Sequence, residues 1–273
     1  MVGGHLQDLI DTRLQLHHAA QLANAAAMSY LSAQPDDSHT NLEWLARQQA
    51  LAAVPVTGNR TIRVAVQVVP FELIVIEDEK VVDHFPLNGK RRIDAEQWLR
   101  AQVRTAGLDP ARFTTKKHYE IPDHPVAHGA NFDAPERDLK LCASLWSASD
   151  AAFRAFAAQR TGASAVRCWP HHFDLATLVA LDPAATRTIG VGFSLGDDSY
   201  SQPYFYIGPY PRPSIEALPP LTIGHWHTNG WVGVVLTAFE WQLESQSESE
   251  QPRLLESFIQ SGFEAARRVL PGA

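Results

Sequence analysis

The sequence predicts an α+β protein of two pseudo-repeated helix–β-sheet–helix halves packed as one unit. Three observations predict this class. Stretches with a helical hydrophobic period alternate with stretches rich in β-branched residues. An irregular segment separates two similar series of elements. When the first half of the chain is overlaid on the second at an offset of 102 residues, Phe71 pairs with Phe173 and Leu73 with Leu175, which indicates an internal duplication.

The first half, residues 1–134, opens with helical periodicity. Apolar residues recur at spacings of three, four and seven over 9–30, and a second helical stretch is predicted over 41–53. Runs of β-branched residues then predict three strands, followed by a helix that Gly107 closes. These four elements are expected at residues 62–69, 71–76, 81–85 and 94–106. Prolines and glycines across 109–134 predict an irregular loop.

The second half, residues 135–273, repeats this outline. Pro135 suits the first turn of a helix that Gly162 ends. Four strands follow, then a polar linker over 245–250 and a last helix that Pro252 opens. The strands are expected at residues 166–181, 188–195, 204–207 and 231–237.

The composition excludes several classes of partner. Of the 273 residues, 45% are hydrophobic, which suffices for a buried core, and the formal net charge is −7. Nucleic-acid-binding proteins usually carry a basic stripe, and the clusters 90–92 and 116–117 are short, so nucleic acid is not expected. No apolar run approaches the roughly 20 residues of a membrane helix. A start without signal-peptide features and only two cysteines favour a reducing, cytoplasmic location.

Two pairs of side chains have the spacing of metal ligands on strands. If residues 169–177 form one strand, His172 and Asp174 share a face, because side chains alternate. His225 and His227 share a face in the same way. Convergence of the two pairs predicts a site for zinc or another divalent transition metal, since imidazole and carboxylate suit these ions. The alternative is that the histidines bond to backbone or tyrosine groups in a polar core.

Two acidic residues complete the predicted site. Asp197 and Asp198 follow a predicted strand in a Gly-Asp-Asp turn. We expect one of them to act as a catalytic base or further ligand, with the ion activating a bound water. An acidic, solvated turn is the simpler interpretation.

Aromatic residues crowd the same part of the chain and predict a pocket for a small-molecule ligand. Amphipathic rings with a few polar groups are typical of pocket linings, although they also fill cores and brace sheets. The expected ligand-binding residues are Trp169, Tyr204, Tyr206, Trp226, Asn229 and Trp231, with Tyr200 nearby.

Two possible nucleophiles have weaker support. Gly192, Ser194 and Gly196 match the nucleophile elbow of α/β-hydrolases, but turn-like residues follow Ser194 where a helix is required. Glycines that allow a tight turn and close packing are the favoured interpretation. Cys168 lies too far along a strand from His172 for direct contact, so a buried thiol is expected.

Four strings of residues resemble a widespread family of uncharacterised bacterial proteins of similar length. The strings span residues 119–126, 168–176, 192–206 and 224–228. The resemblance covers the chain from about Leu42 to the last helix. It implies a bacterial, cytoplasmic protein and carries no catalytic residues over.

Three functions remain open from the sequence. The first is a metal-dependent enzyme, a hydrolase or lyase that hydrolyses or hydrates a small polar molecule. The second is a non-catalytic small-molecule-binding protein that uses the aromatic cleft, and the third is a protein-interaction module.

Overall fold

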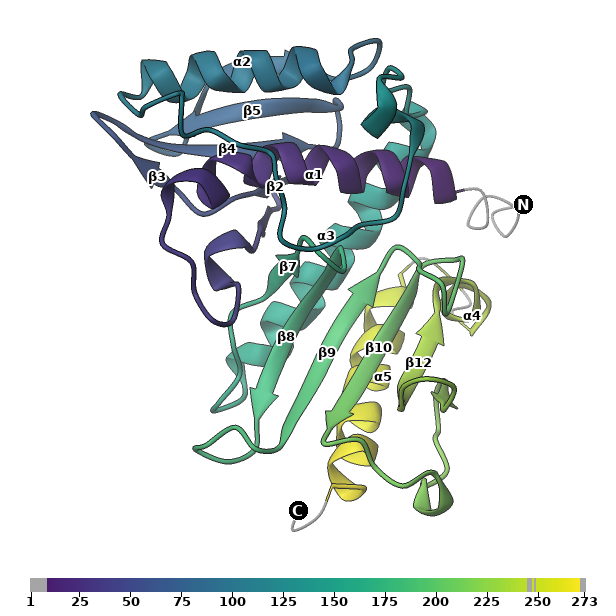
Figure 1. Ribbon diagram of the computed structural model, residues 1–273. Coiled ribbons are helices and arrows are strands. Elements are labelled where there is room, and N and C mark those ends of the chain that lie inside the picture. The colour runs from purple at the N-terminus through teal and green to yellow at the C-terminus, as the bar shows by residue number, and fades with distance from the viewer. Residues whose placement is uncertain (1–8, 245–246, 248, 271–273) are drawn as a thin grey trace. The chain divides into compact units, whose positions relative to one another are not determined.

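The computed structural model describes residues 9–244, 247 and 249–270, which are divided between two compact units (Figure 1). Both contain helices and antiparallel strands, so the protein is α+β. The N-terminal unit comprises Asp11–Ser147 and Arg167–Phe173. Of the described residues, the C-terminal unit comprises 9–10, 148–166, 174–244, 247 and 249–270. The division falls inside helix α3, and the boundary predicted from the sequence lies after residue 134.

The N-terminal unit is built around an antiparallel sheet of order β1-β2-β4-β5-β6, with β3 paired to β4. Small residues such as Ala50, Ala52 and Ala65 lie in its core beside Ile74. The strands are β1 (Glu43–Leu45), β2 (Ala50–Ala52), β3 (Val56–Thr57), β4 (Thr61–Gln67), β5 (Glu72–Glu77) and β6 (Lys80–Pro86). β7 (Arg167–Trp169) joins this unit through backbone bonds between Cys168 and Leu42.

Aromatic contacts fix the helices of the N-terminal unit. Trp98 of α2 contacts Phe85 of β6 at 5.6 Å between ring centroids, and Trp146 of α3 contacts Trp44 at 5.5 Å. The helices are α1 (Ile10–Tyr30), α2 (Arg92–Thr105) and α3 (Glu136–Ala158), with short 3₁₀ helices η2 (Ser38–Thr40) and η3 (Pro125–His128). Within the described residues, no helix is apolar over enough of its length to cross a membrane.

Buried polar residues of α1 anchor the irregular loop 109–134. His18 Nε2 lies 3.1 Å from the Pro122 carbonyl oxygen, and the Tyr119 hydroxyl donates to Gln21 at 2.8 Å. Because α1 is buried on nearly every side, these side chains need partners inside the unit, and the loop supplies them.

The C-terminal unit contains an antiparallel sheet whose strand order includes β11-β12-β10-β9-β8. On β8, residues alternate between buried and more exposed positions, as expected for a strand covered on one face. The strands are β8 (Asp174–Ala180), β9 (Thr188–Ser194), β10 (Tyr204–Tyr210), β11 (His225–His227) and β12 (Gly233–Thr237).

Helices cover one face of this sheet. α5 contacts β9, β10 and β12, and its Phe263 packs against Phe156 of α3 with ring centroids 5.2 Å apart. Trp241 of α4 contacts Phe205 on the same face. In Figure 1 β10 lies in front of α5. The helices are α4 (Ala238–Glu244) and α5 (Gln251–Arg268), with a short η4 (Ile215–Ala217).

Most of the predicted elements are confirmed, and two predictions are wrong. Residues 41–53 form the β1–β2 hairpin instead of a helix, because each strand pairs with a neighbour and Gln49 adopts a positive φ of 48° in the connecting turn. The predicted strand 166–181 is interrupted by a turn over 170–173, where Phe173 has a φ of 59°. The helix α4 was not expected. Residues 245, 246 and 248 of the predicted linker lie outside the described residues.

Candidate functional site

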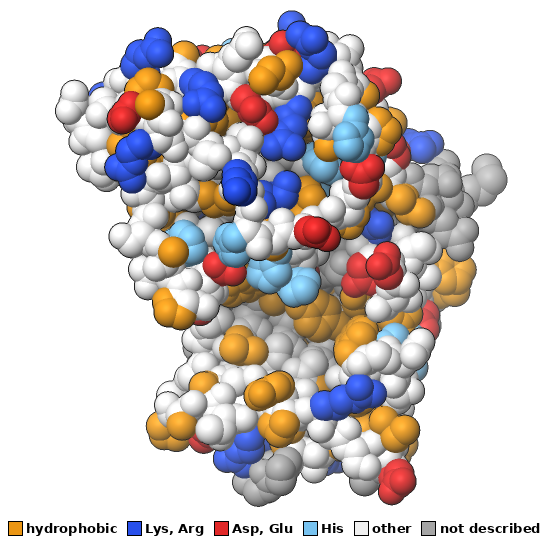
Figure 2. Space-filling view, in the orientation of Figure 1, with side chains coloured by type: hydrophobic (Ala, Val, Ile, Leu, Met, Phe, Trp, Pro, Cys, Tyr) orange, Lys and Arg blue, Asp and Glu red, His pale blue; other side chains and the backbone are white. Residues whose placement is uncertain are grey.

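One face of the C-terminal sheet carries a cluster of aromatic, histidine and acidic side chains, here called the aromatic face. α5 covers the opposite face, where its Gly262 approaches Ile207 and Val234. Because side chains alternate along a strand, Tyr204 and Tyr206 of β10 point away from α5. Figure 2 shows apolar side chains gathered over β8–β10. The aromatic face comprises Asp174, Asp197, Tyr200, Tyr204, Tyr206, His225, His227 and Trp231.

The strand register sets which of these residues adjoin. Asp174 of β8, Ser194 of β9 and Tyr204 of β10 are partners in one row across the sheet. In the next row on this face, Gly192 pairs with Tyr206. Since Gly192 has no side chain, the Tyr206 ring can cross β9 toward β8.

Two glycines allow large rings to lie directly on the backbone. A Cβ atom added at Gly192 would come closer than 3.0 Å to the Tyr206 ring. One added at Gly233 would lie 2.5 Å from Cζ3 of Trp231. The close-packing interpretation of Gly192 is thereby confirmed, with Tyr206 as the packed group.

The rings form a continuous series of contacts. Trp231 stacks on His227 with centroids 4.3 Å apart and meets Tyr206 edge-on at 6.3 Å. His227 contacts Tyr200 at 5.4 Å, and Tyr200 contacts Tyr204 at 4.8 Å. These rings therefore form one connected aromatic surface.

Carboxylates hold the hydroxyl groups of two β10 tyrosines, Tyr204 and Tyr206. Tyr206 donates to Asp174, and Tyr204 donates to Asp197 at 2.5 Å. Burial, followed by these neighbouring carboxylates, raises the pKa of both tyrosines well above its ordinary value. Both phenols therefore stay protonated as donors. Asp197 is fixed in turn by the backbone N–H of Tyr200 at 3.1 Å.

A single phenol oxygen joins the two histidines of β11. Tyr200 Oη lies 3.1 Å from Nε2 of His225 and 3.0 Å from Nδ1 of His227. Nε2 of His227 lies 2.5 Å from the carbonyl oxygen of Asn229, which can only accept, so this nitrogen carries a proton. With that proton on Nε2, Nδ1 of His227 can accept from the Tyr200 hydroxyl.

Glu240 of α4 extends this series of hydrogen-bonded side chains. Its Oε1 lies 3.4 Å from Nδ1 of His225. Its Oε2 accepts from the backbone N–H and the hydroxyl of Thr237, each at 2.8 Å, and the Glu240 N–H donates back to Thr237 at 3.2 Å. This capping box at the start of α4 orients the carboxylate. The hydrogen-bonded series of carboxylate, imidazole and phenol can hold or move a proton. Burial, then the charges of Glu240 and Asp197, raises the pKa of Tyr200.

The four predicted metal ligands are not gathered at one point. His225 and His227 share a face, as predicted, but three strands separate β11 from Asp174 on β8, about 19 Å at the usual strand spacing. His172 lies exposed in the turn before β8, with its ring 4.3 Å from that of His171. Contrary to the prediction, His172 and Asp174 do not share a strand face, because a turn over 170–173 interrupts that strand. Among the described residues, no group of three or more His, Cys, Asp or Glu could hold a metal ion.

The other predicted site residues are dispersed. Tyr204, Tyr206 and Trp231 belong to the aromatic face. Trp226 points to the other side of β11 and donates from Nε1 to the Pro219 carbonyl at 2.8 Å. Trp169 belongs to the N-terminal unit, where its ring meets His171 edge-on. Asp198 and the Asn229 side chain are exposed.

Ser194 and Cys168 have structural environments. Ser194 is buried at the end of β9, its Oγ accepts from the backbone N–H of Gly196 at 3.0 Å, and no helix follows it within residues 195–203. The context of a nucleophile elbow is therefore absent. Cys168 is fully buried, which confirms the prediction of a buried thiol.

Sequence reasoning missed Glu240. The signal was present, because Thr237 followed three residues later by Glu240 is the pattern of a capping box. It would have predicted both the start of α4 and the orientation of the carboxylate.

No protein-family model, curated protein or solved structure matches this chain.

Proposed function

We propose that the C-terminal unit binds a small organic cation on the aromatic face, without catalysis. The observation that carries this proposal is the continuous series of rings from Tyr206 through Trp231 to Tyr204, held at two points by carboxylates. The faces of tryptophan and tyrosine rings attract cations through their quadrupoles, and alkylammonium groups lose little hydration when they bind there.

The charge of this region favours a cation over an anion. Residues 188–240 contain four acidic residues and a single basic one, Arg212. The Arg212 guanidinium is engaged by the carbonyl oxygens of Gly230 at 2.9 Å and Thr228 at 3.4 Å. An anionic ligand would meet Asp174, Asp197 and Glu240 on or beside the same face.

The polar groups of the face are bonded to one another, which suits binding better than reaction. Tyr204 and Tyr206 donate to carboxylates, and Tyr200 lies between two imidazoles. Such a network fixes ring orientations before a ligand arrives, so less conformational entropy is lost on binding.

Indole N–H resonances in ¹H–¹⁵N spectra test the proposal. Choline should shift the Trp231 resonance, whereas those of Trp226 and Trp241, whose N–H groups bond to backbone carbonyls outside the aromatic face, should stay. Trp231→Ala should weaken binding at least about fivefold, the expected size of one cation–π contact. Trp241→Phe is the matched control.

A neutral isostere of choline, dimethylbutanol, separates charge from shape. It should bind much more weakly, because only the cation interacts with the ring quadrupoles and carboxylates. Equal shifts with both compounds, or no movement of Trp231 at millimolar choline, would overturn the proposal.

A metal-dependent hydrolase or lyase is the second candidate. It is favoured by one observation, that nitrogen atoms of His225 and His227 face a common point near Tyr200 Oη. The described residues do not fit a complete site, because four protein ligands or three plus water are usual for zinc and only two converge here. Metal analysis of tag-free protein tests it: sub-stoichiometric zinc, iron, manganese and nickel would refute it.

We also propose that the two halves arose by duplication. The sequence overlay pairs Glu72 with Asp174, and these are the first residues of β5 and β8. Each of these strands is followed by an antiparallel neighbour, β6 and β9. The bacterial origin implied by the family resemblance remains a proposal. So does the cytoplasmic location, which fractionation of the source cells would test.

A further inference from the structure

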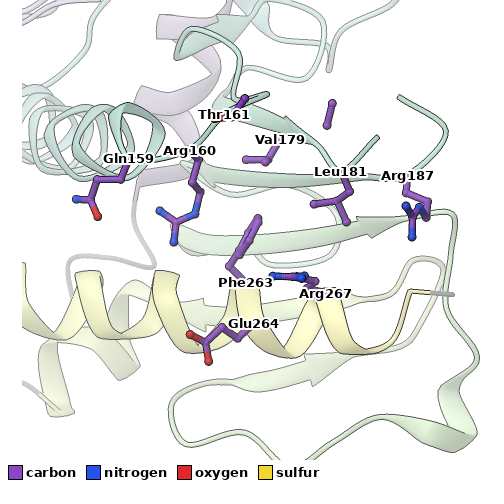
Figure 3. A pocket seen from close by; sticks show the side chains of 10 residues that line it. Gln159, Arg160, Thr161, Val179, Leu181, Arg187, Phe263, Glu264 and Arg267 are labelled. Carbon is purple, nitrogen blue, oxygen red and sulfur yellow. The ribbon is translucent and has the colours of Figure 1, made fainter. Parts of the chain in front are cut away.

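A cavity of about 520 Å³ lies on the helical side of the C-terminal unit (Figure 3). Its walls come from the segment just after α3, the end of β8 with the turn that follows it, and the last turns of α5. Three arginines line it, Arg160, Arg187 and Arg267, together with the single carboxylate Glu264. Such an excess of positive charge is unusual in a chain with a formal net charge of −7.

Arg160 is held in place before any ligand binds. Its guanidinium lies over the Phe156 ring at 3.7 Å from the centroid and near Phe263 at 5.0 Å. It donates to the Phe156 carbonyl at 3.0 Å and to Gln260 at 2.6 Å. A stacked guanidinium keeps further N–H groups free to bind an anion, since arginine has five donors in a rigid plane.

The other two arginines differ in their partners. Arg187 is paired with Asp182 at 3.3 Å. Arg267 is exposed on the last turns of α5, and within the described residues no carboxylate lies within 4.0 Å of it. In Figure 3, Arg160 and Arg267 lie on opposite sides of the Phe263 ring, and the Glu264 carboxylate points away from Leu181 and Arg187. Glu264 is largely exposed, so water screens its charge.

The wall of the cavity also has an apolar part. Val179 and Phe263 are buried, and Leu181 is half-buried beside them. A ligand that fits this cavity therefore combines a strongly anionic group with an apolar one.

We propose that this cavity binds a phosphate monoester that carries a small apolar group. A phosphate dianion accepts several charge-assisted hydrogen bonds, and guanidinium groups match its geometry in a bidentate manner. Arg267 contacts the phosphate, and Phe263 and Val179 contact the apolar group. Arg160, on the other side of the Phe263 ring, adds a second positive charge to the wall of the cavity. This site lies on the opposite side of the sheet from the aromatic face and does not depend on its function.

Titration of the full chain with phenyl phosphate at low salt tests this proposal. Arg267→Gln should raise the Kd at least about tenfold, because one charge-assisted pair is lost. Arg253→Gln is the matched control, since Arg253 is also exposed on α5 but lies 14 residues earlier, about 21 Å along the helix. The Kd of the Arg253→Gln variant for phenyl phosphate should stay within about twofold of that of the unsubstituted chain.

Phenol and inorganic phosphate separate the two parts of the ligand. Phenol should not bind, and inorganic phosphate should bind more weakly than phenyl phosphate. Equal weakening by Arg267→Gln and Arg253→Gln would show nonspecific charge attraction and overturn the proposal. Absence of phenyl phosphate binding at concentrations on the order of 10 mM would also overturn it.

Discussion

Gly192→Ala should destabilise the protein, although alanine normally suits a strand better than glycine. Gly192 pairs with Tyr206, whose ring lies on the Gly192 backbone while its hydroxyl donates to Asp174. The new Cβ would come closer than 3.0 Å to that ring. Tyr206 must move, and its hydrogen bond to Asp174 is broken or bent.

The two opposing contributions can be compared. A hydrogen bond to a charged acceptor contributes about 1.5–3 kcal/mol. Alanine recovers about 0.5–1 kcal/mol of the conformational entropy that glycine loses on folding. We therefore expect Gly192→Ala to lower the free energy of unfolding by about 1–2 kcal/mol.

Gly190→Ala is the matched control on the same strand and face. A Cβ there meets nothing closer than 3.9 Å, which is ordinary van der Waals contact. This variant should be neutral or slightly stabilising. Urea unfolding measures both free energies. In a Tyr206→Ala background, where the ring is absent, adding Gly192→Ala should lower the free energy of unfolding little or not at all. If both glycine variants have the same midpoint, the packing argument is wrong.

Three further outcomes follow from the structure. Burial, above all, lowers the pKa of His17 and His18 to about 4, so between pH 6.5 and 4 only the unfolded chain binds protons at these residues. The free energy of unfolding should therefore fall as the pH drops through this range, by up to about 3 kcal/mol per histidine. Urea titrations at several pH values measure this slope, and His17→Gln should flatten it. A thiol reagent should label neither Cys142 nor Cys168 in the native protein and both in urea, since both are fully buried; rapid native labelling would contradict their burial. Thr237→Ala should cost about 0.5–2 kcal/mol in thermal or urea unfolding because it removes the cap of α4, whereas an unchanged midpoint would show that the cap contributes nothing.

Local hydrophobic patterns correctly predicted the helices and strands whose own residues carry a clear period. The helix 9–30 and the strands at 62–69, 188–195 and 204–207 carry strong periods, and each is present. The shared face of His225 and His227 was also predictable, because it needs only an extended backbone.

Other features depended on distant partners. Residues 41–53 have a period compatible with a helix, but β2 pairs with β4, and strand pairing outweighs local propensity. The turn before β8 is fixed by Phe173, whose ring stacks on His17 at 4.6 Å and meets Trp146 edge-on at 5.3 Å. Neither neighbour is close in sequence to the turn.

The sequence by itself determined the α+β class, most elements and the concentration of aromatic and acidic residues in the second half. Only the tertiary structure decided which of those residues meet. The register of β8–β10 placed Tyr206 across Gly192 beside Asp174, and the strand order separated Asp174 from His225. The physical reason is that a local period fixes the face on which a side chain lies, whereas its neighbours on that face depend on pairing between strands distant in sequence.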